Sequence, residues 1–113
     1  MSTIFSKIIA GEIPCDKVYE SDTVLAFKDI APNAKIHVLF IHKEETKNLS
    51  DLMKRHPEQI SEIFQAITEY VEQVGLEQSG YRVVTNINQF GGQTVFHTHF
   101  HLLAGEQLRG FGA

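Results

Sequence analysis

The sequence predicts an α+β domain with a mostly antiparallel five-stranded sheet, one long helix and a short N-terminal helix. Strand-like segments fall into two groups, one amphipathic helical segment separates the groups, and no linker divides the 113 residues. Grouped strands that do not alternate with helices are typical of α+β domains. A chain of this length is normally one domain, so we expect a single domain over residues 1–113.

The N-terminal half is expected to hold one short helix and three strands. The segment "TIFSKIIAGEIP" can form a helix that stops at Gly11 and does not resume at Pro14. A turn at residues 21–22 predicts a hairpin between the first two strand segments, and the loop "IAPNAK" precedes the third. These segments are rich in β-branched and aromatic residues: "KVYES", "TVLAFKD" and "IHVLFIH".

The middle of the chain carries the clearest helical pattern. Pro57 is a good first helical residue, Gly75 is a good terminator, and a short helical turn is expected before them at residues 50–55. The final two strands are predicted at "YRVVTNI" and "TVFHTHFHLL", joined by the turn "NQFGG". Spacings of three, four and seven place these apolar residues on one helix face: Ile60, Ile63, Phe64, Ile67, Tyr70, Val71 and Val74.

Composition narrows the possible partners. Ten basic and 14 acidic residues give a net charge of -4, which argues against binding nucleic acid or anionic membranes. Cys15 is the only cysteine, so neither an intrachain disulfide nor a Cys-rich zinc site can form, and we expect this thiol to be inert. The N-terminus lacks the apolar core of a signal peptide and no segment reaches membrane-spanning length, so we expect a cytoplasmic protein.

Three of the six histidines alternate within "FHTHFHLL". In a strand, His97, His99 and His101 would share one face, which must look into a cleft or solvent. The opposite face is mostly apolar and is expected to pack on the helices; it would carry Phe96, Thr98, Phe100 and Leu102. An inert surface row is a poor explanation, because imidazole has no strand propensity that would place three in register.

A metal site and a catalytic site both remain open from these residues. Imidazole is a common zinc ligand, but the third histidine of one strand reaches a shared ion with difficulty, and no carboxylate lies between Glu77 and Glu106. A neutral imidazole is also a competent nucleophile. The preceding "GGQT" could hold a phosphate, because Gly92 allows close backbone approach while Gln93 and Thr94 add side-chain donors.

The segment "GGQTVFHTHFHLL" resembles the signature of the histidine triad family, in which three histidines alternate with apolar residues after a Gly-Gln-Ser/Thr segment. "TIFSKIIAGEIP", "VLAFKDIAPNAKIHVLFIHK" and "YRVVTN" resemble its nucleotide-binding branch and bacterial-type purine nucleoside phosphoramidases, so the likeness spans almost the whole chain. The sequence departs from the family at Thr98, where an apolar residue is usual. Its tail "EQLRGFGA" also lacks the tryptophan-containing C-terminus of animal members.

The resemblance implies a homodimer whose two sheets join, with a purine nucleotide pocket on each protomer. It also implies hydrolysis of purine nucleoside 5′-phosphoramidates, including adenosine phosphoramidates and aminoacyl adenylates, through a covalent nucleotidyl-histidine. No metal and no cofactor are expected to take part. The alternatives are a diadenosine polyphosphate hydrolase of the same fold, or a nucleotide-binding or interaction protein whose turnover is incidental.

The same resemblance assigns roles to individual residues. His99 would be the nucleophile, with its other ring nitrogen donating to the carbonyl of His97, and His101 would contact the phosphate. His37 matches a fourth histidine expected to connect to the triad through His97, and Asp29 would bind both ribose hydroxyls. The phosphate or leaving group would be held by Asn86, Gly92, Gln93, Thr94 and Val95. Core residues, of which one or two could contact the base, are Phe5, Ile8, Phe27 and Ile30.

Several of these residues have ordinary structural explanations. Without the family, Asp29 and Asn86 would be taken for turn residues. No role is implied for His42 or His56, and a solvated surface is expected for both.

Overall fold

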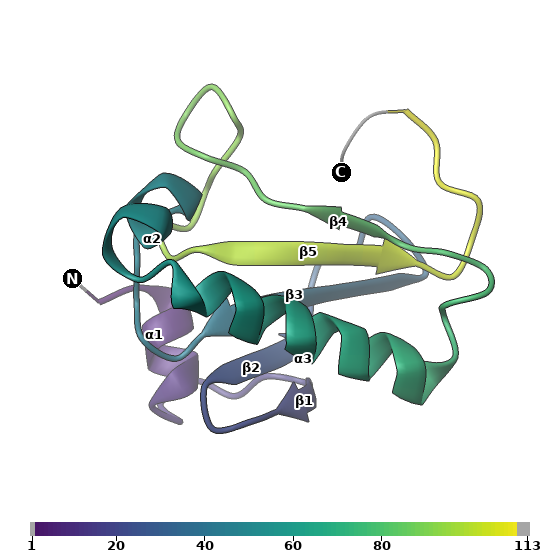
Figure 1. Ribbon diagram of the computed structural model, residues 1–113, viewed down its shortest axis with the longest axis horizontal. Helices are drawn as coiled ribbons and strands as arrows, with labels where there is room; N and C mark the ends of the chain where they lie inside the picture. The colour runs from purple at the N-terminus through teal and green to yellow at the C-terminus, as the bar shows by residue number, and fades with distance from the viewer. Residues whose placement is uncertain (1, 111–113) are drawn as a thin grey trace.

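The computed structural model describes residues 2–110. It contains an antiparallel sheet with the strand order β1-β2-β3-β5-β4, so the predicted five-stranded sheet is confirmed. Figure 1 shows β4 at one edge of this sheet and β1 at the other. The strands are β1 (Lys17–Glu20), β2 (Val24–Lys28), β3 (Ile36–His42), β4 (Arg82–Val84) and β5 (His99–Ala104).

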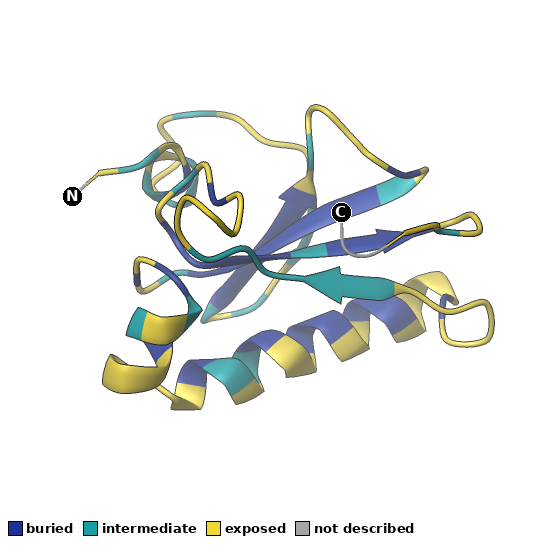
Figure 2. Ribbon diagram, turned by 90° about the horizontal axis from the view of Figure 1, so that it is seen from above, coloured by how far each residue is buried: buried dark blue, intermediate teal, exposed yellow. Residues whose placement is uncertain are grey.

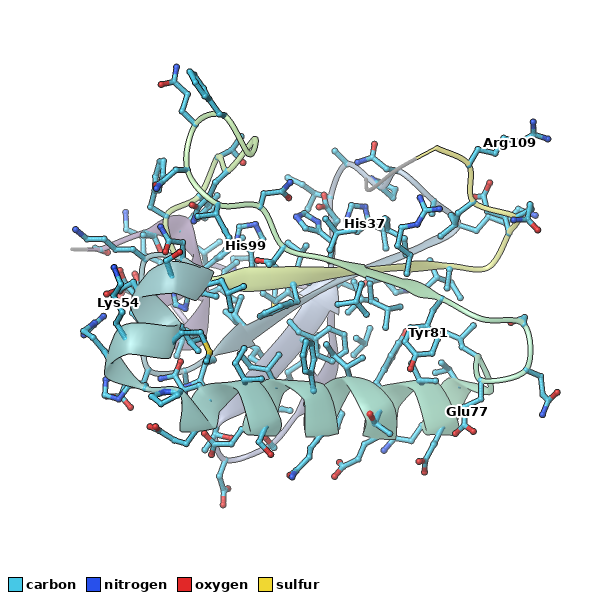
Figure 3. All side chains as sticks on the ribbon, turned by 45° about the horizontal axis from the view of Figure 1, so that its top comes forward. His37, Lys54, Glu77, Tyr81, His99 and Arg109 are labelled. Carbon is cyan, nitrogen blue, oxygen red and sulfur yellow. The ribbon has the colours of Figure 1, made fainter. Side chains whose placement is uncertain are left out.

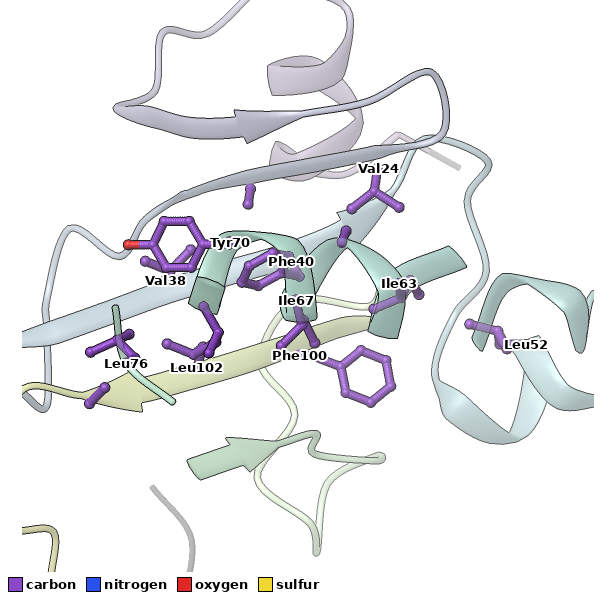
Figure 4. Packing of buried hydrophobic residues seen from close by; sticks show 14 residues of the cluster. Val24, Val38, Phe40, Leu52, Ile63, Ile67, Tyr70, Leu76, Phe100 and Leu102 are labelled. Carbon is purple, nitrogen blue, oxygen red and sulfur yellow. The ribbon is translucent and has the colours of Figure 1, made fainter. Parts of the chain in front are cut away.

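Helix α3 (Glu58–Val74) covers one face of the sheet and confirms the predicted long helix. It ends at Gly75, whose φ of 73° is in the left-handed region that glycine adopts readily. Figure 2 shows its buried side toward the sheet, and Figure 4 shows the core between them, including Phe40, Tyr70 and Phe100. The sequence pattern was only partly right about the buried face, because Phe64 and Val74 are exposed while Gln59 and Ala66 are buried.

Helix α1 (Ile4–Ile9) lies on the face of the sheet opposite α3. It begins with a capping box, in which Thr3 Oγ1 accepts from the backbone of Ser6 and Ser6 Oγ accepts from the backbone of Thr3. Its buried Phe5 joins a second core cluster with Leu25, Phe27, Leu39 and Ile41. A third helix, α2 (Leu49–Arg55), follows the N-cap Asn48 and matches the expected helical turn.

The last strand is shorter than the alternating sequence predicts. Strand β5 begins at His99 instead of residue 94, and β4 ends at Val84 instead of residue 87. Between them the chain forms local turns, and the backbone N–H of Thr98 donates to the carbonyl of Thr46, outside the sheet ladder. His97 therefore precedes the strand, and Phe96 is exposed instead of packed on the helices.

No helix in the described part of the chain is long and apolar enough to cross a bilayer.

Candidate active site

His99 begins β5 on the side of the sheet that faces away from α3 (Figure 3). Its Nδ1 donates to the carbonyl of His97 at 2.7 Å, and because Nδ1 holds the proton, Nε2 of the neutral ring carries a lone pair. The ring is buried and Phe5 contacts it edge-on, with centroids 5.0 Å apart. Burial lowers the pKa of His99 below its ordinary value, so the ring is neutral at pH 7.

His97 is buried just before β5 and supports His99 through its main chain. Its Nε2 donates to the carbonyl of His42 at 3.0 Å, and burial lowers its pKa. The carbonyl of His99 accepts from the hydroxyl of Thr85 at 2.8 Å. The ring of His97 is thus held by His42, and the backbone of His99 is held by Thr85.

His37 sets the tautomer of His101. The backbone N–H of Asn33 donates to Nδ1 of His37 at 3.0 Å, so the ring proton of neutral His37 is on Nε2. That Nε2 is 2.9 Å from Nδ1 of His101 and donates to it, which places the proton of His101 on its Nε2. Burial, followed by the nearby rings of His99 and His37, lowers the pKa of His101 to about 4.

The expected link between His37 and His97 is wrong. Strands β3 and β5 are antiparallel, with Leu39 opposite His101 and Ile41 opposite His99. His37 lies two residues before Leu39 and contacts His101, while His97 lies beyond the other end of β3 and contacts His42.

Asp29 completes this group at the end of β2. Its Oδ1 accepts from the backbone of Ala31 at 2.8 Å, and its Oδ2 is 3.5 Å from Nε2 of His37. Asp29, His37 and His101 each offer one ligand atom within 4.8 Å of the others, which is the spacing of a metal site. A metal at Nε2 of His37 would require its proton to move to Nδ1, toward the N–H of Asn33, so the hydrogen bonds oppose metal binding here.

The loop before His97 is held by the side chains of Asn86 and Gln93. The amide of Asn86 donates to Gly91 O at 2.8 Å, and Gln93 Oε1 accepts from the backbone of Asn88 at 2.8 Å. Gln93 Nε2 donates to the carbonyls of Lys47 and Val95, so its amide is fully occupied. The expectation that Gln93 donates to a phosphate is therefore wrong, because its amide instead shapes the loop.

The backbone of this loop leaves donors for an anion. Gly92 has a φ of 82°, which favours glycine, and its N–H closes the turn to Gln89. Within residues 2–110, the N–H groups of Thr94 and Val95 have no hydrogen-bond partner. These two N–H groups lie three and two residues before His97 in the chain, and such backbone donors can bind the oxygens of a phosphate.

Comparisons with known proteins agree with this arrangement. The model of the HIT domain family matches residues 10–108, and HIT abbreviates histidine triad. The chain belongs to the histidine triad family. Purine nucleoside phosphoramidase of Escherichia coli strain K12 is 42% identical over 106 residues, covering 94% of this chain and 89% of that protein.

Solved structures show the same histidine triad fold. A histidine triad protein from Clostridium difficile has a TM-score of 0.91 and 41% identity, covering 96% of this chain and 95% of its own. A HIT family hydrolase from Clostridium thermocellum has a TM-score of 0.90 and 39% identity, covering 96% of this chain and 94% of its own.

His37, His99 and His101 lie close together, although His37 joins the triad through His101 and not through His97 as predicted, and some neighbours also differ from expectation. Phe5 and Phe27 are buried and Ile8 is half-buried, whereas Ile30 is 99% exposed and is not a core residue. Ile30 directly follows Asp29 in a surface loop, so nothing packs over it.

His42 was also wrongly expected at the surface. It is buried, and its ring donates to Glu62 of α3 and accepts from the backbone of Glu44. Its carbonyl accepts a hydrogen bond from Nε2 of His97. His56, in contrast, is half-buried beside Glu44 and Glu58. The role of His42 in the histidine triad site comes from its carbonyl, which every residue has, so its side chain gives no sequence signal.

Proposed function

We propose that this protein hydrolyses purine nucleoside 5′-phosphoramidates, such as adenosine phosphoramidates, to a nucleoside monophosphate and an amine, and that it also cleaves aminoacyl adenylates, which release a carboxylate instead of an amine. The observation that carries the proposal is the orientation of His99, whose Nδ1–H is held by His97 O and whose Nε2 lone pair is left to attack. The E. coli relative named purine nucleoside phosphoramidase and the solved HIT family hydrolase support the same chemistry.

The proposed reaction has two steps. Nε2 of His99 attacks the α-phosphorus, and a bond from phosphorus to that nitrogen forms. The bond from phosphorus to the leaving group breaks: an amine leaves after it takes up one proton from solvent, whereas the carboxylate of an aminoacyl adenylate leaves without a proton. Water then attacks the nucleotidyl-histidine, releases the nucleoside monophosphate and returns one proton to solvent. His101 bears its proton on Nε2, so it can donate a hydrogen bond to a phosphoryl oxygen in both steps.

Asp29 is the proposed ribose ligand. An ionised carboxylate can accept about four hydrogen bonds. The carboxylate of Asp29 accepts from the backbone of Ala31 and lies close to His37. Its remaining lone pairs are enough to accept from two ribose hydroxyls. The exposed apolar side chain of Ile30, which follows Asp29, is proposed to contact the purine ring. Phe27, Phe5 and Ile8 belong to one apolar cluster, from which one or two residues are proposed to contact the base.

The loop after Asn86 is the proposed phosphate site. Gly92 has no side chain, so a phosphate can come close to the backbone there. The N–H groups of Thr94 and Val95 are available as donors to its oxygens. Asn86 and Gln93 act by holding the loop in this shape.

The protein is proposed to act as a homodimer. β4 is an edge strand, and pairing with a second copy would join two sheets and satisfy the exposed backbone groups. Exposed apolar residues lie on α3 and just before β4: Phe64 is 42% exposed, Val74 47% and Tyr81 42%. Burying such residues is a common source of stability for a small chain.

The decisive experiment compares a fluorogenic adenosine phosphoramidate with a diadenosine polyphosphate. We expect turnover of the first to dominate and to survive dialysis against a strong chelator. His99→Ala should abolish turnover while keeping nucleotide binding, whereas His56→Ala, outside the site, should behave like wild type. Quenched turnover should trap a phosphorus–nitrogen adduct on His99.

Each other outcome points elsewhere. Faster cleavage of the diadenosine polyphosphate would indicate that hydrolase class, and binding without turnover would indicate an interaction protein. Activity lost on chelation and restored by zinc would replace direct attack with a metal mechanism.

A further inference from the structure

Thr98 occupies a position between His97 and His99 where the family usually has an apolar residue. It is 2% exposed, and Thr46, in the segment between β3 and α2, is 1% exposed. A hydroxyl buried this completely is costly unless it has a hydrogen-bond partner. The two threonines supply partners for each other.

Three contacts join the two residues. The backbone N–H of Thr98 donates to Thr46 O at 2.9 Å, and Thr98 Oγ1 donates to the same carbonyl at 3.2 Å. The two hydroxyl oxygens are 2.6 Å apart. Because the hydrogen of Thr98 points to the carbonyl, the hydroxyl of Thr46 donates to Thr98 Oγ1, and both hydroxyl hydrogens are used.

This contact acts on the ring of His99 through one peptide group. The carbonyl of His97 accepts from His99 Nδ1, and the N–H on the other side of the same peptide bond is that of Thr98. A trans peptide is a rigid plane, so anchoring its N–H to Thr46 also fixes its C=O. The segment that carries Thr46 directly follows His42, the last residue of β3, whose carbonyl accepts from the ring of His97.

We propose that Thr46 and Thr98 are positioning residues that lock the His97–Thr98 peptide plane and, through it, the tautomer and direction of the His99 ring. The kinetic part of this proposal rests on the proposed function, in which His99 is the nucleophile. The ring orientation itself does not depend on that function.

The first test is a set of variants at the two positions. Thr98→Val leaves the buried hydroxyl of Thr46 without its acceptor, so kcat should fall about tenfold while KM for the phosphoramidate stays within about twofold. Thr98→Ser keeps the hydroxyl and should recover most of kcat. Thr46→Val/Thr98→Val replaces both threonines with apolar groups of the same shape and should be closer to wild type than Thr98→Val.

If Thr98→Val does not fold, Thr46→Val takes its place in the kinetic test. It keeps the donation from Thr98 to the Thr46 carbonyl, so its loss of kcat should be smaller. An equal or larger loss in Thr46→Val would contradict the hydrogen-bond directions proposed here.

The second test measures the ring of His99 by ¹⁵N NMR, without substrate. Wild type and Thr98→Ser should hold the proton on Nδ1, and Thr98→Val should show a mixture of tautomers. If Thr98→Val lowers only the melting temperature, with kcat and tautomer unchanged, the pair is merely structural and the proposal is overturned. If the tautomer shifts and kcat does not, the positioning role holds and the nucleophile assignment fails.

Discussion

Acidification is expected to destabilise the fold through its site histidines. Burial is the first cause that lowers the pKa of His37, His97, His99 and His101, and His101 falls to about 4. Each ring is also held in a neutral tautomer by its hydrogen bonds. Protonation in the folded state would break the hydrogen bonds that Nδ1 of His37 and Nδ1 of His101 accept, and it would leave a buried charge on His97 and His99. The unfolded chain therefore takes up protons first as the pH falls.

The size and the pH window follow from the shift at His101. Its folded pKa is below the unfolded value of about 6.5, so between about pH 6.5 and 4 the unfolded chain binds more protons and stability falls as the pH is lowered. Above pH 7 the contribution of His101 to the free energy of unfolding is constant. One pKa unit corresponds to about 1.4 kcal/mol, so between pH 7 and pH 5 His101 alone should cost at most about 2 kcal/mol.

Urea unfolding at pH 7, 6 and 5 measures this loss, since most carboxylates stay ionised in that range. His101→Gln removes the titrating ring and keeps an acceptor for His37, so its stability should fall by about 2 kcal/mol less than that of wild type over the same range. His56→Gln is the matched control and should follow wild type. Equal losses in wild type and His101→Gln, or a folded His101 that titrates near pH 6.5 by NMR, would refute the reasoning.

Three further predictions concern the ribose site, the phosphate loop and the dimer. Asp29→Ala should weaken adenosine monophosphate binding at least about tenfold by calorimetry, and a 2′,3′-dideoxy analogue should lose most of the same affinity on wild type; undiminished binding in both cases would remove the ribose role. Gly91→Ala should cost about 1–3 kcal/mol in urea unfolding, because a Cβ there would lie 2.4 Å from Ile87 O; an unchanged midpoint would mean that the loop adjusts freely. If the proposed dimer forms, Phe64→Glu should convert it to the 12.8 kDa monomer in sedimentation equilibrium, with Gln65→Glu as the exposed control; wild type found only as monomer would reject the proposed dimer.

The helices were predictable because their signals are local. Gly11 and Gly75 follow the ends of α1 and α3, and the spacing of Ile63, Ile67 and Val71 marks the buried face. These features depend on residues within a few turns of each other, which one sequence displays directly. The cluster of histidines was predictable too, because the alternation of His97, His99 and His101 is rare and the family motif is specific.

The connections within the site were not predictable in the same way. Whether His37 contacts His101 or His97 depends on the register of β3 against β5, which long-range pairing sets. The alternating pattern also suggested a strand through residues 94–98, but an alternating pattern does not show whether a neighbouring strand is present to pair with.

The sequence by itself determined the fold class, the helices and the residues that could do the chemistry. The tertiary structure decided which nitrogen of each histidine carries the proton. His97 and Thr98 reach partners on His42 and Thr46, 55 and 52 residues away, and the acceptors that hold them include main-chain carbonyls. Every residue has such a carbonyl, so only the folded chain shows which of them face the triad.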